Sequence, residues 1–151
     1  MNKNIDDLNW SKSFMYALHQ TYFLAEKRLE SRLRDIHGIT FSQFLILLGL
    51  HCTGKSSQNA IAIFLFITEA TVSRHVSVLE KAKYLTRKAD ATNRRRHILE
   101  MTMLGKKVFT TAHEIIQSEL EDIFSCIQHK DRSRITKSFE GVIDKLKNKH
   151  K

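Results

Sequence analysis

Residues 68–102 read TEATVSRHVSVLEKAKYLTRKADATNRRRHILEMT, and this stretch decides the fold that we predict for the chain. Its first part, residues 68–81, carries apolar residues at helical spacing. Its second part predicts two short strands, over residues 84–88 and 97–102. The loop between the strands, residues 89–96, contains three consecutive arginines, Arg94, Arg95 and Arg96. A helix is therefore followed directly by a basic hairpin.

The predicted helix over residues 68–81 has two different faces. Because a helix turns by about 100° per residue, Val72, Val76 and Leu79 fall on one side and are expected to face the core. A face of small polar residues around one arginine can approach base edges in a major groove, where arginine can reach guanine O6 and N7. An ordinary amphipathic surface helix would show the same periodicity, so both interpretations stay open at this point. The opposite face comprises Ala70, Thr71, Arg74, Ser77, Val78 and Lys81, with Ser73 and His75 on its flanks.

A short helix precedes this one. Ser56 or Ser57 is expected to cap its start, and Thr68 is expected to cap the helix that follows. Two helices joined by only a few residues predict a helix-turn-helix, and the hairpin after it makes the unit a winged helix. In the short helix, which extends to about residue 65, the side chains expected to pack inward are Ile61, Phe64 and Leu65.

The hairpin is expected to turn Leu85, Leu99 and Met101 inward and to leave Arg87 and Glu100 outward. Consecutive arginines on a surface loop are costly unless they meet anions. Arginine can enter a narrow minor groove, where the negative potential is enhanced. The hairpin therefore predicts a second contact with a nucleic acid beside the helix.

Helices with surplus apolar faces flank this unit. The sequence predicts a helix over residues 6–36 that ends at Gly38, followed by a helix that Thr40 and Gln43 open as a capping box. Thr102 is expected to cap a further helix to about Ile127, and a last helix follows it. The apolar stripes are Met15, Leu18, Tyr22, Ala25, Leu29, Leu33 and Ile36; Leu104, Val108, Ala112, Ile115, Leu120, Ile123 and Ile127; and Ile135, Phe139, Val142 and Leu146.

These stripes resemble interhelical seams more than surfaces. We therefore expect one mainly α-helical domain over residues 1–151 that forms a two-fold dimer. Residues 1–37 and 103–151 would supply the dimerisation helices, and residues 38–102 would form the winged helix-turn-helix lobe with its small β-wing.

The charge of the chain points to a polyanionic partner. Lysine and arginine exceed aspartate and glutamate by nine, 25 against 16. Residues 74–107 hold ten basic and three acidic side chains, so most of the excess lies in the predicted helix and hairpin. A merely solvated basic surface would have the same composition, so charge alone does not decide between these interpretations.

Composition excludes several other classes. The mean hydropathy is −0.32, and no apolar run approaches the roughly 20 residues of a membrane helix, so we expect a cytoplasmic protein without a membrane partner. Cys52 and Cys126 form no CxxC pair, which favours two buried or idle thiols over a disulfide or zinc site. We expect no metal and no cofactor. The sequence holds no glycine-rich phosphate loop, HExxH motif or nucleophile elbow, so we expect no enzyme.

At this point the chain resembles the MarR family of winged helix-turn-helix transcriptional regulators. The segments that carry the resemblance are ITFSQFLILLGL (residues 39–50), TEATVSRHVSVLEK (68–81) and DATNRRRHILEMTMLGKKV (90–108). The last is similar to the family's wing signature, although Ala91 stands for its proline and Asn93 for its second aspartate. Ala82-Lys83 stands where Lys-Gly is typical, which removes a glycine C-cap.

The resemblance implies a homodimeric, sequence-specific DNA-binding regulator, a repressor, that recognises a pseudo-palindromic operator. It also implies release by a small amphipathic ligand, whose site the sequence leaves unassigned. The alternative is a dimeric ligand-binding or protein-interaction module of the same fold without specific DNA binding. The residues expected to contact double-stranded DNA are Thr68, Thr71, Ser73, Arg74, His75, Ser77, Lys88, Arg94, Arg95 and Arg96.

Overall fold

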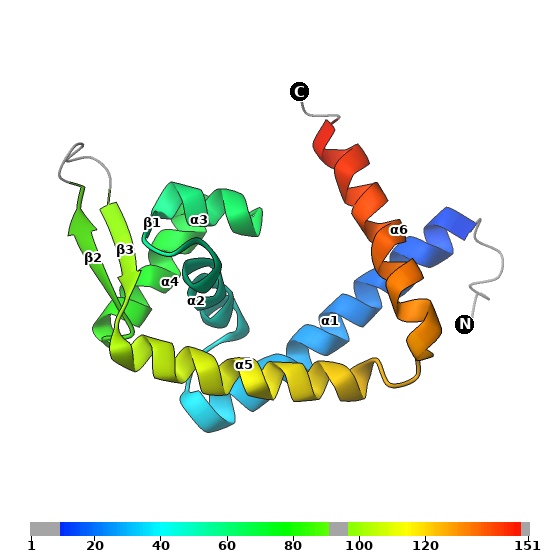
Figure 1. The fold of residues 1–151 in the computed structure, drawn as a ribbon, viewed down its shortest axis with the longest axis horizontal. Coiled ribbons are helices and arrows are strands. Elements are labelled where there is room, and N and C mark those ends of the chain that lie inside the picture. Colours follow the sequence, from blue (N-terminus) through cyan, green and yellow to red (C-terminus); the bar gives the residue numbers. More distant parts are fainter. Residues whose placement is uncertain (1–9, 91–96, 149–151) are drawn as a thin grey trace, which may run out of the picture. The chain divides into compact units, whose positions relative to one another are not determined.

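The computed structural model describes residues 10–90 and 97–148. It confirms the predicted fold class, because the described chain is mostly helical with one small antiparallel sheet (Figure 1). The chain divides into two compact units, Met1–Gln117 and Ser118–Lys151. In order, the elements are α1 (Trp10–His37), α2 (Phe41–Thr53), β1 (Ser56–Ser57), α3 (Gln58–Leu65), α4 (Glu69–Lys81), β2 (Leu85–Ala89), β3 (His97–Met101), α5 (Met103–Ile123) and α6 (His129–Asn148).

The junction between α1 and α2 follows the predicted caps. Gly38 takes a φ of +62°, the left-handed conformation that commonly ends a helix. The Thr40 hydroxyl accepts the Gln43 N–H at 3.0 Å, and the Gln43 side chain accepts the Thr40 N–H at 2.9 Å. The Glu30 carboxylate of α1 also accepts the Phe41 N–H, which places a negative charge at the start of α2. The capping box is therefore confirmed.

The helix-turn-helix is confirmed as α3 and α4. Ser57 caps α3 and Thr68 caps α4, each through a hydroxyl that accepts a backbone N–H three residues later. Val72, Val76 and Leu79 are buried, as their spacing predicted. The side chains that this lobe buries form one core beneath the helices and the sheet, and those with almost no exposure include Ile46, Leu47, Ile61, Leu79, Leu85 and Leu99.

One prediction for α3 is wrong. Ile61 is buried, but Phe64 is 42% exposed and Leu65 is half-buried. Phe64 packs by one edge near Gly49 of α2, where a Cβ would lie 3.5 Å from the Phe64 ring. The helix ends at the next residue, since Phe66 takes a φ of 55° and turns the chain toward α4. No further turn of α3 follows to cover the other edge of Phe64.

The wing is a hairpin of β2 and β3, to which β1 adds a third strand that the sequence did not predict. The order is β1-β3-β2, with Ser57 opposite Ile98 and Arg87 opposite Leu99. Leu85 and Leu99 are buried, as predicted. The prediction that Arg87 points away from them is wrong, because residues opposite one another across an antiparallel pair share a face. Arg87 lies half-buried on the same side as Leu99.

The start of α5 is held against the end of α4 at Tyr84. The Thr102 N–H donates to the Tyr84 carbonyl at 3.0 Å, and the Thr102 hydroxyl donates to the Lys83 carbonyl at 2.7 Å. The same hydroxyl accepts the Gly105 N–H at 3.0 Å, which confirms the predicted cap. A Cβ on Gly105 would lie 1.8 Å from the Tyr84 carbonyl oxygen, so only glycine fits there.

This close approach determines which face of α5 is buried. Its buried residues are Gly105, Phe109, Ala112 and Ile116, whereas Leu104 is 49% exposed. At this end the buried face of α5 is therefore rotated by about one residue from the predicted stripe, which began at Leu104. The helix also ends at Ile123 rather than Ile127, and Arg132 stabilises the following turn by donating to the Ile127 carbonyl.

The flanking helices leave apolar side chains in solvent. In α6 no residue is buried among those described. The first half of α1 is similar, whereas Leu29 and Leu33 near its end are buried. Cys52 and Cys126 are both exposed free thiols, so of the two predicted alternatives, buried or idle, the buried one is wrong. The exposed apolar side chains are Met15, Tyr16, Leu18, Tyr22, Phe23 and Leu24 in α1 and Ile135, Val142, Ile143 and Leu146 in α6.

Replacement of Gly105 by alanine tests the junction. Because the new methyl group would overlap a backbone carbonyl that cannot rotate away, we expect Gly105→Ala to lower the free energy of unfolding by about 3 kcal/mol or more. Chemical denaturation followed by circular dichroism measures this loss. Gly141→Ala in α6 is the matched control, since nothing lies within 4 Å of its Cβ position. That change should stabilise the helix by about 0.5–1 kcal/mol, and equal effects of the two substitutions would contradict the close contact.

Candidate nucleic-acid interface

The outward face of α4 presents the predicted contact residues together. Ala70 and Arg74 are exposed, and Thr71, Ser73 and Ser77 are half-buried along the same helix. The opposite face is anchored in the core by Val72 and Val76. The helix is therefore held on one side while its small polar side is open, with a single long cation at the centre.

Hydrogen bonds connect three predicted contact residues in a row, Thr68, Thr71 and Arg74. The Thr68 hydroxyl accepts the Thr71 N–H at 3.2 Å and lies 2.9 Å from the Thr71 hydroxyl. The Thr71 hydroxyl in turn accepts from Nη2 of Arg74 at 3.4 Å. This chain draws the Arg74 guanidinium toward the N-terminal end of α4, the end that reads base edges when such a helix lies in a major groove.

Ser77 is arranged differently. Its hydroxyl donates to the Ser73 carbonyl at 3.0 Å, one turn back in the same helix. That bond occupies the only proton of Ser77, so the side chain can offer a partner only acceptor positions.

His75, on the flank of the outward face, is half-buried and is influenced by the charge of Glu30 in α1. Burial lowers its pKa below the ordinary value of 6.5, the positive charge of Arg74 lowers it further, and the Glu30 carboxylate raises it. Glu30 itself pairs with Arg34 at 2.7 Å and caps α2. His75 is therefore a predicted contact residue whose pKa also depends on a carboxylate of α1.

The predicted hairpin contacts are only partly described. Lys88 is exposed on β2, opposite Ile98. The predicted loop and its three arginines, Arg94, Arg95 and Arg96, lie outside the described residues.

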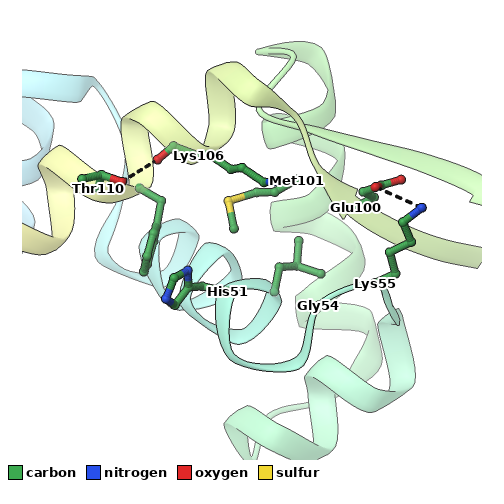
Figure 2. A pocket seen from close by; sticks show the side chains of 9 residues that line it. His51, Gly54, Lys55, Glu100, Met101, Lys106 and Thr110 are labelled. Carbon is green, nitrogen blue, oxygen red and sulfur yellow. Dashed lines mark hydrogen bonds and ion pairs between the residues drawn. The ribbon is translucent and has the colours of Figure 1, made fainter.

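A cleft that the sequence did not predict lies at the base of the wing. It has a volume of ≈ 540 Å³ and is formed where α2, β3 and α5 meet (Figure 2). His51 stacks on Phe109 with ring centroids 4.5 Å apart, and Lys55 pairs with Glu100 at 3.1 Å. Both pairs join residues far apart in the sequence, so no local pattern indicated the cleft. Its lining comprises Leu50, His51, Gly54, Lys55, Glu100, Met101, Lys106, Phe109 and Thr110.

The lobe that holds this face also carries a family signature. Residues 37–96 match the MarR family. The resemblance predicted from the sequence is thereby confirmed over α2, α3, α4 and the start of the wing. A comparison with curated protein sequences gave no match.

Solved MarR-type structures share the fold. The regulator BldR from Sulfolobus solfataricus is 21% identical, with a TM-score of 0.81 over 96% of this chain and 99% of its own. A mutant MarR from E. coli complexed with operator DNA is 15% identical, with a TM-score of 0.77 over 84% and 91%. BpsR from Bordetella bronchiseptica, whose DNA binding is regulated by 6-hydroxynicotinic acid, is 19% identical, with a TM-score of 0.77 over 85% and 97%.

One departure from the MarR pattern leaves the backbone unchanged. Lys83, which stands where glycine is typical, still takes a left-handed φ of 62°. The Tyr84 N–H donates to the Leu79 carbonyl and the Lys83 N–H to the Glu80 carbonyl, so α4 ends in a Schellman motif. A lysine in this conformation costs about 1–2 kcal/mol more than a glycine.

Within residues 10–90 and 97–148, no single helix is long and apolar enough to cross a membrane. The consecutive helices α3 and α4 together reach the length and apolar composition of a membrane span, but the chain bends by 115° between them. The same part of the chain holds no group of three or more histidine, cysteine or acidic side chains that could bind a metal ion.

The environment of His75 predicts a measurable titration. We expect NMR to find its pKa below 6.5, and Arg74→Ala to raise it, because that change removes a nearby positive charge. Since folding lowers this pKa, the unfolded chain binds the proton more tightly. The contribution of His75 to stability is therefore complete above pH 6.5 and is lost as the pH falls through the folded pKa. A His75 pKa at or above 6.5 in the folded protein would contradict this environment.

Proposed function

We propose that the protein is a homodimeric transcriptional regulator that binds a pseudo-palindromic DNA operator and acts as a repressor. The observation that carries the proposal is the outward face of α4, where Thr71 and Thr68 hold Arg74 at the open end of the helix. This face belongs to the segment that matches the MarR family. The proposed activity is binding rather than catalysis.

In this proposal α4 is the recognition helix. Arg74 reads guanine through O6 and N7, and the hydroxyls of Thr68 and Ser73 contact bases or phosphates. Ser77 on the outward face and His75 on its flank complete the contact. Lys88 and the hairpin arginines, Arg94, Arg95 and Arg96, bind phosphates or the minor groove beside it. Because phosphate contacts release counterions, binding should weaken steeply as salt rises.

A dimer is supported by the apolar surfaces of the flanking helices. Phe23 and Leu24 of α1 are 57% and 62% exposed, and Leu146 of α6 is 59% exposed. Burial of such side chains against a second copy would stabilise the dimer by about 25 cal/mol for each Å² removed from water. A two-fold dimer would present its recognition helices to major grooves about 34 Å apart, which fits a pseudo-palindrome.

A small amphipathic effector is supported by the cleft at the base of the wing and by the regulation of BpsR by 6-hydroxynicotinic acid. The cleft combines the stacked rings of His51 and Phe109 with two lysines. Lys55 is paired with Glu100, whereas the Lys106 ammonium makes no ion pair with a described residue. An aromatic anion would fit this lining, since its ring would pack on the rings of His51 and Phe109 and its charge would face Lys106. The bound anion would contact β3 through Glu100 and Met101, which line the cleft.

Selection of bound duplexes from a random pool tests DNA binding. We expect a palindromic motif, and we expect Arg74→Ala to weaken binding to it by about 1–3 kcal/mol and to relax the choice of one base pair in each half-site. Gel shifts at fixed salt measure the loss. Arg134→Ala, at an exposed arginine of α6, is the control that should leave binding unchanged. Equal binding of all duplexes would instead favour a ligand-binding or protein-interaction module.

Calorimetry with 1-naphthoate and its neutral analogue 1-naphthamide tests the effector cleft. We expect the anion to bind more tightly, and Lys106→Met to weaken the anion about fivefold without affecting the amide, as expected for one partly exposed charge contact. Lys107→Met is the matched control, because Lys107 is the exposed neighbour that does not line the cleft. Equal effects of the two substitutions, or equal binding of the two probes, would exclude the cleft as an anion site.

A further inference from the structure

We infer that Thr71 is a positioning residue, which directs Arg74 toward a guanine while Thr68 carries the same hydrogen-bond chain to a DNA phosphate. The inference rests on the proposed function, because it assigns separate roles within the DNA-facing surface. Side-chain chemistry alone would treat Thr68 and Thr71 as equivalent contacts. The hydrogen bonds between them and Arg74 distinguish the two.

Two of these hydrogen bonds have a direction that chemistry requires. A guanidinium and a backbone N–H can only donate. The Thr71 hydroxyl oxygen must therefore accept from Arg74, at 3.4 Å, and the Thr68 hydroxyl oxygen must accept from the Thr71 N–H, at 3.2 Å. Only the contact between the two hydroxyls, at 2.9 Å, can run either way.

DNA would select one direction for that remaining bond. Phosphate oxygens only accept, so Thr68 can contact a phosphate only by donating its own proton outward. The bond between the hydroxyls must then run from Thr71 to Thr68. In this arrangement Thr71 has used its only proton on Thr68 and one acceptor position on Arg74, so it cannot donate to a base.

Arg74 loses little by this bond. The guanidinium has five N–H groups, and two are enough for the paired contact to guanine O6 and N7. An exposed arginine is otherwise free to rotate, and its ordering opposes binding. The bond to Thr71 orders the Arg74 side chain in the free protein, so less conformational entropy is lost when DNA binds.

The test compares Thr71→Val and Thr71→Ser in the full chain, each alone and combined with Arg74→Ala. Fluorescence anisotropy measures the Kd for the selected duplex and for the duplex with adenine at the guanine whose choice Arg74→Ala relaxes. Valine keeps the shape of threonine but has no hydroxyl. We expect Thr71→Val to weaken guanine binding about fivefold and to reduce the preference for guanine over adenine, as for loss of one hydrogen bond to a charged group.

Four comparisons separate positioning from other roles. Thr71→Ser should restore both affinity and guanine preference, and Thr71→Val should have no further effect once Arg74 is alanine. Ser138→Ala is the control, since Ser138 lies in α6, away from the proposed contact face, and its hydroxyl donates to the Arg134 carbonyl within that helix. Replacement of the phosphate that Thr68 contacts by a neutral methylphosphonate should weaken DNA binding by the wild-type protein. The same replacement should not change DNA binding by Thr68→Ala, whose folding circular dichroism checks.

The opposite results would overturn the inference. If Thr71→Val still weakened binding in the Arg74→Ala background, or changed the choice of a different base pair, Thr71 would itself read a base. If Thr71→Val left guanine preference unchanged, it would not direct Arg74. A wild-type protein with no sequence preference would instead remove the proposed function, which the duplex selection shows independently.

Discussion

The contact of α5 with the Tyr84 carbonyl is the constraint on which the rest of the lobe depends. Tyr84 ends the Schellman motif of α4 and precedes β2, and its carbonyl accepts the Thr102 N–H from the end of β3. Gly105 then approaches the same carbonyl more closely than any other residue could. The end of α4, both long strands of the wing and α5 therefore meet at one backbone group, and a shift in one of them would strain its contacts with the others.

This junction connects the outward face of α4 to α5, one of the long helices on which a dimer would depend. The outward face of α4 can be small and polar because Val72, Val76 and Leu79 secure the other side. At its end, Lys83 keeps a left-handed conformation that favours glycine, which shows that tertiary contacts override the local preference. The cleft beside the junction shares β3 and α5 with it. A ligand there would act on the wing through the same elements.

Some features were predictable from residues close together in the sequence. The caps at Thr40, Ser57, Thr68 and Thr102 depend on a hydroxyl and an N–H three residues apart, so a short pattern is sufficient. The buried face of α4 follows from helical periodicity in the same way. Errors had two sources: a misjudged local spacing and the influence of elements distant in the sequence. Arg87 was assigned to the wrong face of the sheet, although its spacing of two from Leu85 already implied the same side. Phe64 was expected inside, and β1 was not expected at all.

The sequence by itself determined the order and type of the long elements, the basic character of the wing and the polar face of α4, because these are properties of neighbouring side chains. Only the tertiary structure decided the rotation of α5, the pairing of Ser56–Ser57 with β3 and the cleft between His51 and Lys106. It also showed that Thr71 holds Arg74 and that His75 is influenced by Glu30. The physical reason is that a helix or cap needs only contacts along the chain, whereas these features need residues brought together by packing, whose distances the order of residues does not contain.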